Sequence, residues 1–90
     1  MEFEWDEDKA STNLSKHGVS FDEAKTVFDD PFYIDFYDPD HSDDEDRYLI
    51  IGQSQRRRVL IVSYTERAHK TRVIRAREAT RREREAYEEG

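Results

Sequence analysis

The chain has 90 residues, of which 41% are charged and 34% hydrophobic, with no cysteine and a net charge of −7. This length predicts a single domain over residues 1–90, and the lack of cysteine excludes disulfides and thiolate metal sites. No apolar run reaches the roughly 18 residues of a membrane span. No apolar stretch follows the N-terminus as in a signal peptide, so we expect a cytoplasmic protein with no membrane partner.

The first predicted element is a short strand at residues 1–5, where charged and aromatic residues alternate. A helix is predicted to follow, because Asp6 is a favoured N-cap residue and Gly18 a favoured helix stop. The inner face of this helix is expected to comprise Ala10, Leu14 and His17, which have helical spacing.

A second helix is predicted to begin at Ser20, which forms a capping-box pattern with Glu23. Pro31 prevents this helix from continuing further. The apolar face of the helix comprises Phe21, Ala24, Val27 and Phe28.

Four further segments have the aromatic and β-branched composition of strands, namely residues 32–37, 48–52, 59–64 and 71–77. They are joined by the loop 38–46 and by turns at 53–57 and 66–70. The second and third of these strands are almost continuously hydrophobic, which indicates that both of their faces are at least partly covered. A last helix is predicted to begin at Thr80, with Glu83 as its capping-box partner, and to run towards Tyr87.

The predicted order is therefore β-α-α-β-β-β-β-α. Strands joined by short turns favour antiparallel pairing, and helices outside the run of strands favour packing on one side of the sheet. We expect an α+β fold, with a small antiparallel β-sheet and helices packed on one face.

Charge is distributed unevenly along the chain. Residues 1–46 carry a net charge of −13, whereas residues 47–90 carry +6, and the two sum to −7. Either the basic half binds a polyanion such as a nucleic acid, or the two halves neutralise each other within the fold.

Strand alternation predicts where the arginines of residues 71–77 point. Ile74 and Ala76 are expected to face the helices, which leaves Arg75 and Arg77 together on the open face with no acid between them. A pair of guanidiniums suits phosphate binding. In the last helix, by contrast, i,i+4 pairing with glutamates explains the arginines, and the expected pairs are Glu78–Arg82, Arg81–Glu85 and Arg84–Glu88.

The acidic loop 38–46 lacks the glycine and the spaced terminal glutamate of a calcium-binding EF-hand. We therefore expect no metal site and no cofactor. The loop is either solvated, or its charge lies near basic side chains of this chain or of a partner.

Several motifs together resemble the BrnT toxins of bacterial type II toxin–antitoxin systems. They are FEWDEDKASTNLSKHGVSFDEAKTVFDDP, YLIIGQS, SYTER and the closing AREATRRER…Y. The resemblance implies a single RelE-like ribonuclease domain whose RNA cleavage inhibits translation. It also implies a BrnA-like ribbon-helix-helix antitoxin as partner, with operator DNA bound only through the toxin–antitoxin complex.

The resemblance also implies which residues form the site. Those that match the family motifs are Lys16, His17, Glu66, Arg67, Arg77 and Tyr87. Arg75 departs from the family, which often has a small polar residue there, and Arg57-Arg58 replaces a Gly-Arg turn. Arg75 therefore extends the positive face, and Lys70 is expected to add to it at the turn.

Metal-free RNA cleavage uses the 2′-hydroxyl as nucleophile and leaves a 2′,3′-cyclic phosphate. Arginine does not release its proton, so Arg67 and Arg77 are assigned to the phosphate charge. His17 and Glu66 are the candidates for proton transfer. Tyr87 either donates a proton, stacks on a base or closes the last helix against the sheet.

Two other functions are open. The same face would serve a non-catalytic nucleic-acid-binding module, which binds RNA in a salt-dependent way and leaves it intact. It would also serve a partner-binding module that receives an acidic or amphipathic segment of another chain. RNA turnover separates the ribonuclease from both alternatives.

Overall fold

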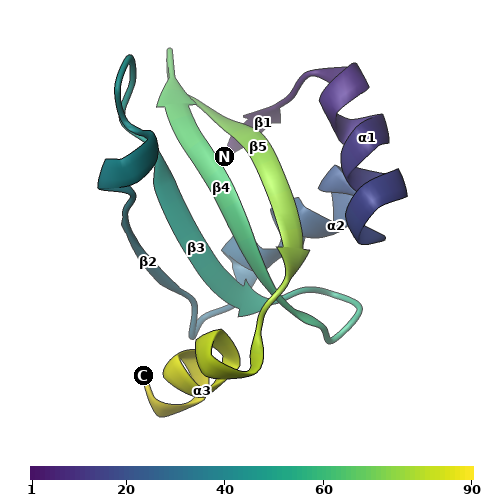
Figure 1. The fold of residues 1–90 in the computed structure, drawn as a ribbon, viewed down its shortest axis with the longest axis vertical. Helices are drawn as coiled ribbons and strands as arrows, with labels where there is room; N and C mark the ends of the chain where they lie inside the picture. The colour runs from purple at the N-terminus through teal and green to yellow at the C-terminus, as the bar shows by residue number, and fades with distance from the viewer.

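A computed structural model describes residues 1–90, and its centre is a five-stranded sheet in the order β1-β5-β4-β3-β2 (Figure 1). The strands are β1 Glu2–Glu4, β2 Ile34–Tyr37, β3 Tyr48–Gln53, β4 Val59–Arg67 and β5 Lys70–Glu78. The helices are α1 Glu7–His17, α2 Phe21–Lys25 and α3 Arg81–Glu89, with 3-10 turns η1 Thr26–Asp29 and η2 Pro39–His41. The α+β class and the predicted element order are confirmed.

The sheet is mixed, so the prediction of a wholly antiparallel sheet is wrong at one edge. β1 pairs with β5 in parallel, with Glu2 opposite Lys70 and Glu4 opposite Arg72. The other neighbouring strands are antiparallel. Short turns determine direction only between consecutive strands, and β1 and β5 are separated by almost the whole sequence.

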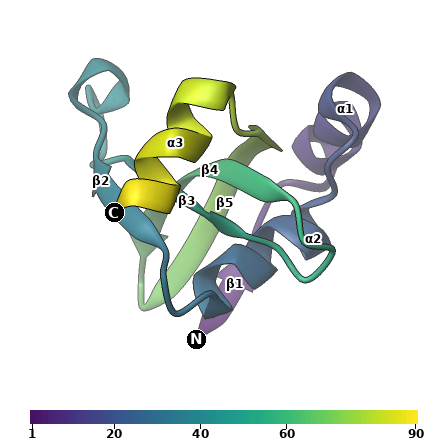
Figure 2. The ribbon, with the colours of Figure 1, turned by 90° about the horizontal axis from the view of Figure 1, so that it is seen from below.

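The helices lie on both faces of the sheet, which corrects the expectation of a single helical face. Figure 2 shows α2 and α3 on opposite sides of the strands. Ile50 faces the main core and is 1% exposed, whereas its neighbour Ile51 faces the other way and is 3% exposed. The central strands are therefore covered on both faces, as their continuous hydrophobicity predicted. None of the helices is long and apolar enough to cross a membrane.

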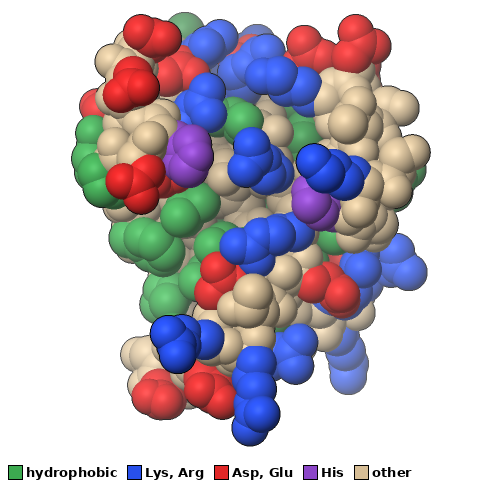
Figure 3. Space-filling model, viewed as in Figure 1, with side chains coloured by type: hydrophobic (Ala, Val, Ile, Leu, Met, Phe, Trp, Pro, Cys, Tyr) green, Lys and Arg blue, Asp and Glu red, His purple; other side chains and the backbone are tan.

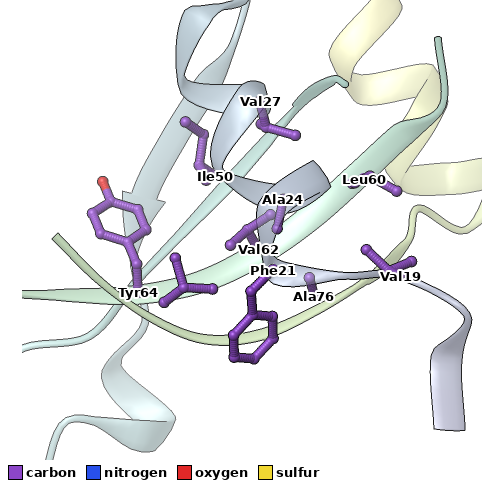
Figure 4. Packing of buried hydrophobic residues seen from close by; sticks show 10 residues of the cluster. Val19, Phe21, Ala24, Val27, Ile50, Leu60, Val62, Tyr64 and Ala76 are labelled. Atoms are coloured by element: carbon purple, nitrogen blue, oxygen red, sulfur yellow. The ribbon is translucent and has the colours of Figure 1, made fainter. Parts of the chain in front are cut away.

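The main hydrophobic core lies between the sheet and the segment formed by α2 and η1 (Figure 4). The core residues are Val19, Phe21, Ala24, Val27, Ile50, Leu60, Val62, Tyr64, Val73 and Ala76. Burial of each larger side chain contributes roughly 1.5–3 kcal/mol. Since this core occupies one face, much of the opposite face of β5 is left open to solvent.

A buried ion pair fixes the β3–β4 hairpin to the rest of the fold. Glu23 is 3% exposed, and its carboxylate accepts hydrogen bonds from Arg58 Nε at 3.0 Å and from Ser54 Oγ at 2.7 Å. Arg58 Nη2 also donates to the carbonyl of Gly18 at 3.0 Å. Ser20 caps α2 through the Glu23 amide, but the Glu23 side chain points into this cluster and does not complete the predicted capping box.

The hairpin turn itself has left-handed backbone at Arg57, with φ +64°. Glycine adopts this conformation at the lowest cost, so the backbone here would accept the Gly-Arg turn that the resemblance implies. The two-residue turn between β4 and β5 is also left-handed, at Ala68 and His69.

Candidate active site

Helix α1 stands beside β5 beyond the end of β1 (Figure 1), and Asn13 connects the two. The Asn13 amide donates to the Ala76 carbonyl at 2.8 Å and accepts from the Ala76 N–H at 3.1 Å. Leu14, predicted to face inward, is 52% exposed. The inner face of α1 is therefore Ala10, Asn13 and His17, which brings His17 to the open side of β5.

An irregularity in β5 determines which side chains point to this open side. Ser63 pairs with Arg75 but the next residue, Tyr64, pairs with Val73, so Ile74 is left without a partner. Val73 and Ala76 are both buried in the core, and Ile74 lies with the arginines. The prediction that Ile74 faces the helices is wrong, because a β-bulge shifts the alternation by one residue.

Two adjoining hollows lie on this open face. The first, of about 580 Å³, contains Lys16 and His17 from α1. The second, of about 260 Å³, contains His41 from η2. Both are lined by Arg47, Ile74, Arg75 and Arg77. Figure 3 shows Lys and Arg side chains gathered over the middle of this face, with histidine side chains on both sides.

Four of the eight residues predicted from the sequence are therefore brought together, namely Lys16, His17, Arg75 and Arg77. The other four do not line these hollows. Arg67 lines a neighbouring hollow that also contains His41 and Arg47. Lys70 lies opposite Arg67 in the β4–β5 register.

Arg77 is not free of acidic partners, contrary to expectation. Glu83 accepts from its Nη1 at 2.8 Å and from its Nη2 at 2.9 Å. The Arg77 guanidinium lowers the pKa of Glu83 to about 2, and Glu83 in turn raises the pKa of Arg77. Glu83 also completes the predicted capping box with Thr80. The same carboxylate thus begins α3 and holds Arg77 in place.

Of the i,i+4 pairs expected on the last helix, Arg81–Glu85 is present at 3.3 Å. Glu78 instead approaches Arg58 at 3.6 Å, and Arg84–Glu88 does not form. Exposed pairs of this kind contribute little to stability. The arginines of the helix, Arg81, Arg82 and Arg84, are exposed and largely solvated.

Arg67 is bound by the acidic loop. Glu45 Oε2 accepts from Arg67 Nε at 3.0 Å and from Nη2 at 2.9 Å. This contact confirms the alternative in which the loop's charge lies near basic side chains of the same chain. No three His, Asp or Glu side chains are placed together as metal ligands.

Of the three arginines that line both hollows, Arg47 and Arg75 are the ones without a close carboxylate. Arg75 is exposed and takes part in no ion pair. Arg47 reaches Glu45 only at 4.0 Å, and its Nε is buried without a hydrogen-bond partner. Because no close carboxylate neutralises the Arg47 guanidinium, its charge favours an anion in the hollows that it lines. Sequence reasoning missed Arg47, which follows the acidic loop directly.

Glu66 and Tyr87 face other parts of the molecule. Glu66 Oε1 accepts from Thr71 Oγ1 at 3.1 Å. The Tyr87 hydroxyl donates to Asp30 at 2.5 Å, and burial with this bond raises the pKa of Tyr87 to about 12. Asp30 also accepts from the Gln53 amide. Through Asp30, Tyr87 therefore anchors α3 to Gln53 at the end of β3. Packing of the last helix against the sheet was one of the three roles considered for this residue.

Comparison with known proteins identifies a family and a similar fold. Residues 5–83 match the family described as ribonuclease toxin, BrnT, of type II toxin-antitoxin system. The fold is similar to the crystal structure of the Brucella abortus ribonuclease toxin BrnT, with TM-score 0.66 and 25% identity over 90% of this chain and 99% of that one. No curated protein sequence matches the chain.

Proposed function

Because this chain belongs to the BrnT family of type II ribonuclease toxins, we propose that it cleaves RNA by metal-independent transesterification on the open face of β5. The 2′-hydroxyl attacks the adjacent phosphorus, and the products end in a 2′,3′-cyclic phosphate and a 5′-hydroxyl. The protein must remove one proton, stabilise the extra negative charge of the phosphorane and return a proton to the leaving oxygen.

The observation that supports this proposal most directly is the first hollow, where one imidazole lies among five cationic side chains and one carboxylate, that of Asp8. The cationic residues that share the hollow with His17 are Lys9, Lys16, Arg47, Arg75 and Arg77. Imidazole exchanges protons near neutral pH, whereas guanidinium stabilises phosphate charge without proton transfer. A hollow that holds both groups supplies the two kinds of chemistry that cleavage requires.

We assign His17 to removal of the 2′-hydroxyl proton. Arg47, Arg75 and Lys16 bind the scissile phosphate. Arg77, which Glu83 holds in place, adds positive charge to the same hollow. Farther along β4 and β5, Arg67 and Lys70 bind a flanking phosphate. Arg67 first breaks its ion pair with Glu45, and the RNA phosphate takes the place of that carboxylate. A catalytic part for Glu66 or Tyr87 stays a prediction from the resemblance, since neither lines the hollow.

In its cell, we propose, the toxin acts in the cytoplasm and stops translation by cutting RNA. A BrnA-like ribbon-helix-helix antitoxin neutralises it, and operator DNA is bound only through their complex. The basic face supports this pairing, because a partner that neutralises the toxin by occlusion must cover the same cationic hollow.

The direct test is cleavage of a defined RNA in EDTA by the purified chain, with and without ribosomes, beside Arg75→Ala and His17→Ala. We expect the parent protein to give products with cyclic phosphate ends. The rate of cleavage should fall by about 100-fold or more in His17→Ala. RNA that is bound in a salt-dependent way but stays intact under both conditions would contradict the proposal and identify a binding module.

A further inference from the structure

We infer that His41, held by Asp38, is the second proton-transfer residue of the site and donates the proton to the leaving 5′-oxygen. This inference rests on the proposed ribonuclease function. It arises from the second hollow, where His41 faces the same arginines that His17 faces from the first. Neither the resemblance nor strand alternation pointed to this residue.

Asp38 fixes the His41 ring. The ring Nδ1 lies 2.9 Å from Asp38 Oδ2, and the Asp38 side chain is only 13% exposed, whereas that of His41 is 56% exposed. An Nδ1–H bonded to a carboxylate leaves Nε2 as the nitrogen that exchanges protons. His41 therefore combines an anchored nitrogen with an accessible one.

Hydrogen bonds within the loop hold the segment that carries Asp38 and His41 in place. The Asp38 amide donates to the Arg47 carbonyl at 2.8 Å, which joins the two ends of the loop. Ser42 Oγ donates to the Asp38 carbonyl at 2.5 Å and accepts from the Arg47 amide at 3.0 Å. Asp38 Oδ1 also accepts from the Asp40 amide at 3.2 Å. These bonds place the imidazole on a supported turn beside the sheet.

The two histidines approach the shared arginines from different elements. His17 ends α1, on one side of β5, and His41 ends η2, next to β3. Arg47, Ile74 and Arg75 line both hollows between them. A phosphate bound there would have one imidazole on each side, which is the placement that in-line displacement requires of its base and its acid.

The charges around His41 have both signs. Its hollow contains the carboxylates of Asp38, Asp40 and Glu83 and the guanidiniums of Arg47, Arg75 and Arg77. The neighbouring hollow adds Asp43, Asp44, Glu45 and Arg67. Of these carboxylates, Asp38 is the one that makes a hydrogen bond to the ring.

In the reaction, the 2′-hydroxyl proton moves to His17 Nε2 or Nδ1 while the O2′–P bond forms. The P–O5′ bond breaks, and the His41 imidazolium gives its proton to the 5′-oxygen. One imidazole gains a proton and the other loses one, so the step is balanced and needs no further reactant. Exchange with water restores both rings.

The test compares an ordinary RNA dinucleotide step with one in which sulfur replaces the bridging 5′-oxygen. A thiolate, with a pKa of about 8.5, leaves without being protonated. His41→Asn keeps an N–H for Asp38 but transfers no proton, so cleavage of ordinary RNA should fall by about 100-fold or more. Cleavage of the sulfur substrate should stay within a few fold of the parent protein, whereas His17→Ala should lose both activities.

The outcomes separate the inference from the proposed function. His69→Asn, at the β4–β5 turn and outside both hollows, is the matched control and should cleave both dinucleotide substrates normally. If the parent protein cleaves RNA and His41→Asn does so equally well, or loses both substrates alike, His41 is not the general acid. If the parent protein cleaves neither substrate even with ribosomes, the ribonuclease function itself fails.

Asp38 is a positioning residue, and its variant tests that role. Asp38→Asn removes the carboxylate that orients the His41 ring, so cleavage of ordinary RNA should fall. Cleavage of the sulfur substrate, which needs no proton on its leaving group, should stay within a few fold of the parent protein. Equal effects of Asp38→Asn on the two substrates, or no effect on ordinary RNA, would overturn the role of Asp38.

Discussion

The side-chain amide of Asn13 pairs with the backbone of Ala76 as a neighbouring strand would. It accepts the Ala76 N–H at 3.1 Å, donates to the Ala76 carbonyl at 2.8 Å and donates to the Val19 carbonyl at 2.9 Å. Asn13 is 6% exposed. One buried polar residue thus joins α1 to β5 and holds His17 beside the arginines.

Replacement of Asn13 by Ala should destabilise the fold by about 3 kcal/mol, because three buried backbone groups lose their partner. Asn13→Asp should also destabilise it, since a carboxylate cannot donate to the two carbonyls. Urea unfolding measures both effects. The control is Leu14→Ala on the exposed side of α1, expected to change stability by about 0.5 kcal/mol or less; equal losses for positions 13 and 14 would contradict the structure.

Glu23→Ala should cost about 3 kcal/mol or more, since it leaves Arg58 and Ser54 unpaired in a partly buried cluster. Arg58 lowers the pKa of Glu23, so the carboxyl is ionised at neutral pH. The neighbouring Asp22→Ala is the control, because its side chain is 76% exposed and pairs with Lys25 only at 3.5 Å. Chemical denaturation should show a small change for Asp22→Ala, and a similarly small change for Glu23→Ala would exclude the pair as a stabilising link.

The Arg77–Glu83 pair predicts a pH dependence of folding. Arg77 lowers the pKa of Glu83 from its ordinary 4.5 to about 2, so the unfolded chain takes up the proton first as pH falls. The stabilisation is therefore present above about pH 5 and is lost as pH falls towards 2. The difference in unfolding free energy between the parent protein and Glu83→Gln should shrink over this range.

A comparison variant for that titration is Glu85→Gln, whose partner Arg81 has a side chain 93% exposed. Exposed pairs contribute little, so this variant should follow the pH profile of the parent protein. A constant difference between the parent protein and Glu83→Gln from pH 6 to pH 2 would show that Glu83 is not perturbed.

Arg75→Ala should weaken RNA binding at every sequence and reduce the slope of log affinity against log salt by about 1, as loss of one phosphate contact does. Fluorescence titration of a labelled single-stranded RNA at several salt concentrations measures the slope. Arg81→Ala removes the same charge from the exposed surface of α3 and should leave the slope nearly unchanged. Equal slopes for both variants would place the phosphates elsewhere.

The sequence by itself determined the local features of this protein. Asp6 caps α1 with its side chain and Gly18 ends it in left-handed backbone, and Thr80 with Glu83 begins α3. These signals depend on residues within one helical turn, so they can be recognised without tertiary contacts. The motifs around His17, Arg67 and Arg77 likewise identified the family that the match over residues 5–83 shows.

Only the tertiary structure decided which of these residues meet. The bulge after Ser63 places Ile74 with Arg75, although simple alternation separates them. Glu83 reaches Arg77 from a different element, and the closed loop brings His41 and Arg47 to the arginines opposite His17. A one-residue shift in register reverses the face of every later side chain, and contacts between distant segments depend on packing that no local pattern encodes.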